Sequence, residues 1–78
     1  MPTDDPKALD QALIDAHARD DKHALVNLYR QAADLSEAAG DLDAACFYLT
    51  HAYVFALQAG APSADTLHTR LVAYGRDE

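Results

Sequence analysis

Hydrophobic residues recur at helical spacing in four consecutive segments of the chain. Residues 6–19 and 22–39 each carry one apolar stripe, residues 42–59 are apolar almost all round, and a fourth segment begins at Ser63 and ends near Gly75. Steps of three and four residues bring side chains onto one side of an α-helix, because a turn takes 3.6 residues. The pattern therefore predicts four α-helices, and connections of only two to four residues favour antiparallel neighbours.

Aspartate and glycine residues mark the ends of these segments. Asp5, Asp41 and either Asp20 or Asp21 stand where N-caps are expected, since an Asp side chain accepts a hydrogen bond from the free N–H groups of a first turn. Gly60 follows the third segment, where a residue in the left-handed conformation commonly ends a helix. These residues fix the expected helix boundaries.

The composition agrees with a small helical domain. Seventeen residues are alanine, whereas three are valine and one is isoleucine. Alanine loses no side-chain entropy in a helix, and β-branched residues do. A chain of 78 residues has room for one core. We therefore expect an all-α fold, an antiparallel helical-hairpin stack of about four helices, in which residues 1–78 form a single domain.

The charge balance is acidic. The chain has thirteen Asp and Glu residues and six Lys and Arg residues, which gives a formal net charge of −7. Such a field repels phosphate backbones and anionic lipid surfaces, so neither a nucleic acid nor a membrane is an expected partner. The apolar run over residues 44–57 is also shorter than the roughly 20 residues that cross a bilayer. The single cysteine and the acidic first ten residues, which do not resemble a signal peptide, favour a cytoplasmic location.

The middle of the chain carries small, bulky and aromatic residues in a characteristic order. A large aromatic residue, a pair of small residues, a glycine turn and a small, bulky, small series follow one another: Tyr29, Ala32, Ala33, Gly40, Asp41, Ala45, Leu49 and Ala52. With these residues, the segment 25–61 resembles one tetratricopeptide repeat, a unit of two antiparallel helices. The helices on either side resemble half repeats. Ser36, where the repeat usually has a tyrosine, and Pro62, which comes later than the usual proline, depart from the motif.

This resemblance implies a protein–protein interaction module and not an enzyme. The binding groove of such repeats is lined by outward residues of the first helix, which map here to Asn27, Arg30, Asp34 and Glu37. The set lacks the Lys and Asn cluster that some members use to hold a peptide carboxylate. Its acids and the net charge favour a basic protein segment as partner. The alternative is that these four residues are simply the solvated face of an amphipathic helix.

The third segment has more apolar surface than its neighbours are expected to cover. One face suits packing inside the protein: Ala45, Leu49, Ala52 and Ala56. Phe47, Val54 and Leu57 point broadly to the opposite side, and the fourth helix can cover part of it. The patch that remains is the expected self-association surface: Phe47, His51, Val54 and Phe55. Monomers rarely expose such a patch, and a two-fold interface lets it bury itself, so we expect a homodimer. The alternative is that the first and fourth helices cover it.

Residues that could carry chemistry do not form a recognisable site. His17, His23, His51, His68 and Cys46 lack the steps of three or four residues that chelation on one helix requires, so no metal or other cofactor is expected. Cys46 fits a buried thiol between helices better than a nucleophile. No catalytic motif is recognisable either. His17, His23 and His68 are expected to be exposed near helix ends.

The sequence thus predicts a small non-enzymatic interaction module, an adaptor or regulatory subunit. Two alternatives stay open. The chain could be an accessory subunit or chaperone-like cap of a larger enzyme or assembly, or it could be a small metal- or thiol-dependent enzyme.

Overall fold

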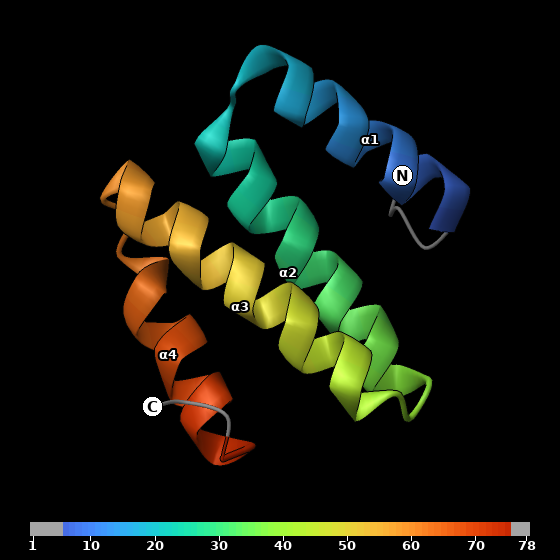
Figure 1. Cartoon of the computed structure of the whole chain (residues 1–78), viewed down its shortest axis with the longest axis vertical. Helices are drawn as coiled ribbons and strands as arrows, with labels where there is room; N and C mark the ends of the chain where they lie inside the picture. The colour runs from blue at the N-terminus through green and yellow to red at the C-terminus, as the bar shows by residue number, and fades with distance from the viewer. Residues whose placement is uncertain (1–5, 76–78) are drawn as a thin grey trace.

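Four α-helices account for most of residues 6–75, the part of the chain that the computed structural model describes (Figure 1). They are α1 (Pro6–Arg19), α2 (Lys22–Ala38), α3 (Leu42–Ala59) and α4 (Ser63–Ala73). The structure is 85% helical, and no strand occurs in the described residues. The all-α prediction is confirmed, and the expected helix boundaries agree with the observed ones to within two residues.

The predicted capping residues act at the helix ends. Asp21 and Asp41 are the N-caps of α2 and α3, and each side chain accepts a hydrogen bond of 3.1 Å from the backbone N–H three residues later. Gly60 ends α3 with a φ of 67°, in the left-handed region that glycine adopts without steric cost. Asp5, the predicted cap of α1, lies outside the described residues. These residues therefore set where α2 begins and where α3 begins and ends.

The helices pack in the order in which they follow along the chain. α1 packs against α2, α2 against α3, and α3 against α4. In Figure 1, α3 runs diagonally between α2 and α4, and α1 lies on the far side of α2. No Cα atom of α1 lies within 8 Å of one in α3, and the same is true of α2 and α4. The result is an antiparallel stack in which α3 has one side left without a helix.

The core lies where α2, α3 and α4 meet. Its buried members are mostly small or aliphatic: Val26, Ala33, Leu49, Ala52, Ala56, Leu67 and Leu71. The alanines of α2 and α3 let the two backbones approach closely, and Leu49 fills the space between them. The predicted inner face of α3 is buried throughout, and so is Cys46. None of the described helices has the length and hydropathy of a membrane span.

Candidate functional site

The predicted groove on α2 is partly occupied by α4. Asn27, Arg30 and Asp34 are exposed and Glu37 is half-buried. Arg70 of α4 donates hydrogen bonds from Nη2 to Asp34 Oδ1 at 2.8 Å and to Glu37 Oε1 at 2.9 Å. Both carboxylates expected to attract a basic partner thus already pair with a cation of the same chain. Only Asn27 and Arg30 of the predicted set project without such a contact.

Tyr74 strengthens this connection between α4 and α2. Its hydroxyl donates a hydrogen bond to the carboxylate of Glu37. That bond, together with burial, raises the pKa of Tyr74 above its usual value of 10.0, because ionisation would remove the donor and place a second negative charge beside Glu37. Arg70 and Tyr74 therefore link α4 to a helix that its backbone does not touch. This side of α2 is chiefly a structural contact.

The second predicted surface is open. Phe47 and Val54 are 57% and 43% exposed, whereas His51 and Phe55 are half-buried. We call these four residues the outer face of α3. Neither α1 nor α4 closes over Phe47 and Val54 in the described residues, so the alternative that those helices cover the patch does not hold for these two side chains. An apolar surface of this kind is a common mark of a protein contact.

A row of rings continues this surface towards α1. We call it the aromatic band, and its members are His17, Tyr29, Phe47, Tyr48, His51 and Phe55. Tyr29 of α2 lies at its centre. Its ring is stacked with those of His51 and Phe55 at centroid distances of 5.2 and 5.8 Å, and is 6.2 Å from that of Tyr48. Burial, and then charge repulsion from the nearby Tyr48 side chain, raise the pKa of Tyr29.

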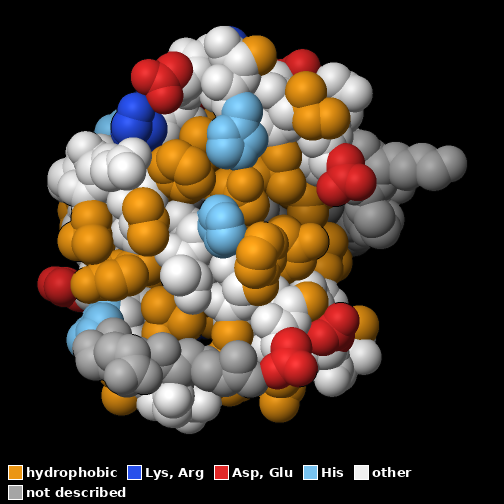
Figure 2. Space-filling view, viewed as in Figure 1, with side chains coloured by type: hydrophobic (Ala, Val, Ile, Leu, Met, Phe, Trp, Pro, Cys, Tyr) orange, Lys and Arg blue, Asp and Glu red, His pale blue; other side chains and the backbone are white. Residues whose placement is uncertain are grey.

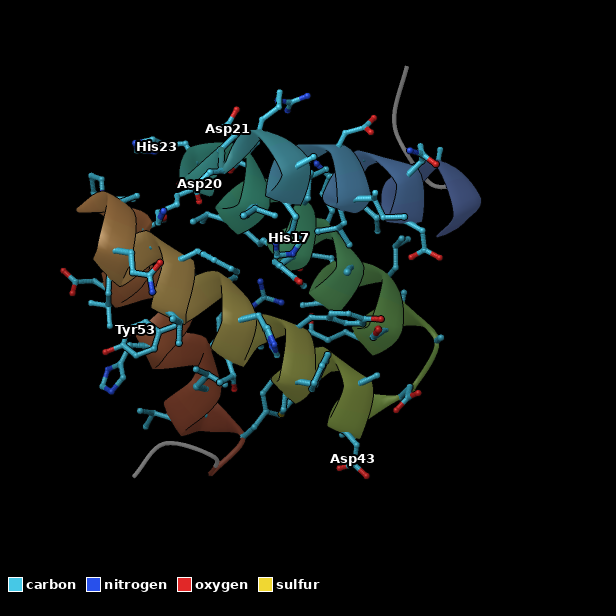
Figure 3. The ribbon with its side chains drawn as sticks, turned by 45° about the horizontal axis from the view of Figure 1, so that its top comes forward. His17, Asp20, Asp21, His23, Asp43 and Tyr53 are labelled. Carbon is cyan, nitrogen blue, oxygen red and sulfur yellow. The ribbon has the colours of Figure 1, made fainter. Side chains whose placement is uncertain are left out.

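Two histidines add ring nitrogens to the band, beside the hydroxyls of Tyr29 and Tyr48. His17 points from α1 into the space between α1 and α3 (Figure 3), where its Nε2 is 2.9 Å from the hydroxyl of Tyr29. His51 Nδ1 lies 2.9 Å from the carbonyl oxygen of Phe47. A carbonyl oxygen only accepts, so Nδ1 carries the hydrogen and the lone pair of neutral His51 is on Nε2. His51 thus places a hydrogen-bond acceptor in an apolar surface.

Two shallow hollows lie along the band. The first, of about 220 Å³, is lined by α1, α2 and the beginning of α3; we call it the α1–α2 hollow, and its lining is Leu9, Asp10, Leu13, Ala32, Leu35, Ser36, Ala39, Asp41 and Tyr48. The second, also about 220 Å³, is the α3 hollow, lined by Thr50, His51, Val54 and Phe55. Figure 2 shows hydrophobic side chains gathered across the middle of this face, with histidines among them and acidic side chains towards its edge.

The other candidate groups have mainly structural surroundings. His23 is exposed, as expected, whereas His68 is half-buried with its ring 5.5 Å from that of Tyr53. The expectation of an exposed His68 was therefore wrong, because α4 turns this residue towards α3. Cys46 is buried. Among the described residues, no group of three or more His, Cys, Asp and Glu is arranged to hold a metal ion.

Sequence reasoning missed the α1 side of this surface. His17 is exposed, as expected, but its contacts with Tyr29 and Phe55 were not expected, and neither was the α1–α2 hollow. The contacts and the hollow depend on how α1 packs against α2. The apolar stripe of α1 alone does not determine that packing. The one available signal was Tyr29, an aromatic residue at the edge of the α2 stripe with a hydroxyl that needs a partner when buried.

No protein-family model matches the chain, and searches of curated proteins and of solved structures find no match.

Proposed function

We propose that this protein is a small non-enzymatic protein–protein interaction module, an adaptor or regulatory subunit acting in the cytoplasm. The observation that carries the proposal is the exposure of Phe47 and Val54 on the outer face of α3. Large aromatic and branched side chains on a folded surface provide binding free energy when a partner removes them from water. The half-buried rings of His51 and Phe55 lie beside them on the same face.

A tetratricopeptide-like character is part of the proposal. Its support is the α2–α3 hairpin, in which Ala33, Ala45, Leu49 and Ala52 are all buried. These residues match the small and bulky positions of the repeat in the sequence. Repeat proteins of this architecture commonly work by presenting surfaces to other proteins and have no turnover of their own.

Self-association of the free protein through the same face is a second part of the proposal. The exposed Phe47 and Val54 are available to meet their own copies across a two-fold axis. Two chains of charge −7 repel each other, however, so such a dimer holds together by apolar contact alone. In this proposal the dimer is the form of the protein without its partner. A partner that fits the outer face of α3 better then displaces the second copy.

Capture from native lysate tests the proposed function. The parent, Phe47→Asp and Val54→Asp are immobilised, and retained proteins are quantified by mass spectrometry. The control is Val72→Asp, because Val72 is 50% exposed on α4 and lies outside the outer face of α3. We expect the two α3 variants to lose proteins that the parent and Val72→Asp retain, since a buried charge without a partner is costly.

Loss of the same proteins from all three variants, or from none, would contradict a role for this face. Circular dichroism of each variant confirms that the helices persist. The accessory-subunit alternative predicts one partner retained in a fixed ratio to the bait, whereas an adaptor retains several.

A further inference from the structure

The surface between α1 and α3 is continuous over both hollows. Tyr48 lines the α1–α2 hollow and its ring lies 5.4 Å from that of Phe47 and 6.2 Å from that of Tyr29. Tyr29 in turn is stacked with His51 and Phe55, which line the α3 hollow. The aromatic band therefore joins two apolar depressions into one surface that three helices line.

The charged residues that line the two hollows are acidic. Asp10 and Asp41 line the α1–α2 hollow, and neither hollow is lined by a lysine or an arginine. Figure 3 places Asp20 and Asp21 at the turn between α1 and α2, at one end of the space between α1 and α3, whereas the side chain of Asp43 points away from α1. A positively charged partner is therefore the electrostatic complement of this surface.

The carboxylates at the turn between α1 and α2 are already paired with cations of the chain. Arg19 lies 3.7 Å from Asp21 and Lys22 lies 3.0 Å from Asp20, while Arg70 is paired on the other side of α2. The net charge stays at −7. Within the described residues no hydrogen bond engages His51 Nε2, which is left as an acceptor for an N–H donor. The surface thus combines apolar contacts with acceptors and negative charge.

We propose that this surface binds a basic amphipathic helix of another protein. This rests on the proposed function and names its partner. Phe47, His51 and Val54 follow one another at steps of four and three residues, the spacing at which a second helix inserts its own apolar side chains. Leucine-like side chains of the partner fill the two hollows, and its lysines or arginines lie beside Asp10 and Asp41. A second copy of this chain brings further acids and fits less well.

Synthetic peptides of about 18 residues, about 27 Å long as helices, test the proposal. One carries leucine at steps of three and four residues and lysine elsewhere, a second carries glutamate in place of lysine, and a third is the first in scrambled order. Binding to the full chain is followed by ¹⁵N–¹H NMR. We expect the Leu/Lys peptide to shift amides of α1 and of the outer face of α3, to dissociate any dimer, and to bind more weakly as salt rises.

Two variants of α1 provide a matched pair. Asp10→Lys reverses a charge in the α1–α2 hollow and is expected to weaken Leu/Lys binding about five-fold, the size of effect that exposed pairs produce. Asp15→Lys makes the same change about 140° away around the helix and is expected to change binding less than about two-fold. Both residues are exposed, so both variants keep the fold.

Equal binding of the scrambled or Leu/Glu peptide, equal effects of the two variants, or shifts confined to Asn27 and Arg30 would overturn the proposal. A dimer that the Leu/Lys peptide leaves intact would overturn it too, because the occupant would then be a second copy. If the peptide fails while Val54→Asp still loses captured proteins, the interaction function holds and only the basic helix is wrong. If both fail, the proposed function is wrong as well.

Discussion

Leu49 is the residue on which the packing of α2 against α3 depends most. It is 0% exposed and lies among the alanines of the inner face of α3. Leu49→Ala leaves a cavity that rigid helices close only in part, so we expect the free energy of unfolding to fall by about 2–5 kcal/mol. Leu57→Ala is the matched control, because Leu57 is 56% exposed on the same helix, and it is expected to change stability by less than about 0.5 kcal/mol. Urea denaturation followed by circular dichroism measures both, and similar losses would contradict the assigned core.

Tyr74 makes the stability of the protein sensitive to alkaline pH. Its pKa in the folded protein is raised, first by the hydrogen bond to Glu37, so the folded state holds the proton more tightly than the unfolded state does. The corresponding stabilisation is complete below about pH 10 and is lost as pH rises through the raised pKa. We therefore expect Tyr74→Phe to show a shallower loss of stability above about pH 10 than the parent.

Thermal unfolding between about pH 9 and about pH 12 measures this dependence. The control is Tyr53→Phe, which keeps the contact between Tyr74 and Glu37 and is expected to follow the parent. Identical profiles for the parent and Tyr74→Phe would show that this hydrogen bond does not contribute.

At the scale of the element, the end of α3 depends on the backbone of Gly60. Its φ of 67° is strained for an alanine, and beyond Gly60 and its two chain neighbours no atom lies within 4 Å of the position that a Cβ would occupy. Gly60→Ala should therefore cost about 1–2 kcal/mol through the backbone alone. Gly60→Asn should cost less, because asparagine tolerates this conformation better. Chemical denaturation compares the two, and equal stability of both variants and the parent would contradict a left-handed end to α3.

The elements themselves were predictable because their signals are local. Asp21, Asp41 and Gly60 act within one turn of their own position, and the stripe of α3 repeats every three or four residues. The contacts between helices were not predictable in this way. Arg70 lies 36 residues from Asp34 and pairs with it only because α4 packs at one particular rotation against α3. The outer face of α3 was predictable because its neighbours in sequence offered too little surface to cover it.

At the scale of the whole molecule, the acidic charge predicts that salt has opposite effects on self-association and on binding of a basic helix, which use the same surface. Self-association brings like charges together, and added salt screens their repulsion, so the dimer should become tighter. Binding of a basic helix should become weaker under the same change. Light scattering after gel filtration at about 0.05 M and about 0.5 M salt should show the mean mass rising from near 8.4 kDa towards twice that value.

Val54→Asp should keep the mean mass near that of one chain at both salt concentrations. A dimer that salt weakens, or that Val54→Asp leaves unchanged, would mean that another surface of the protein forms it.

The central claim is that another protein covers the outer face of α3 in the cell, and photo-crosslinking tests it most directly. Val54 and Val72, which are 43% and 50% exposed on different helices, are replaced one at a time by a photoreactive phenylalanine derivative, and the cells are irradiated before lysis. Position 54 should give covalent adducts with another protein, while position 72 should give few or none. Adducts of equal yield and identity from both positions, or none from position 54, would contradict the claim.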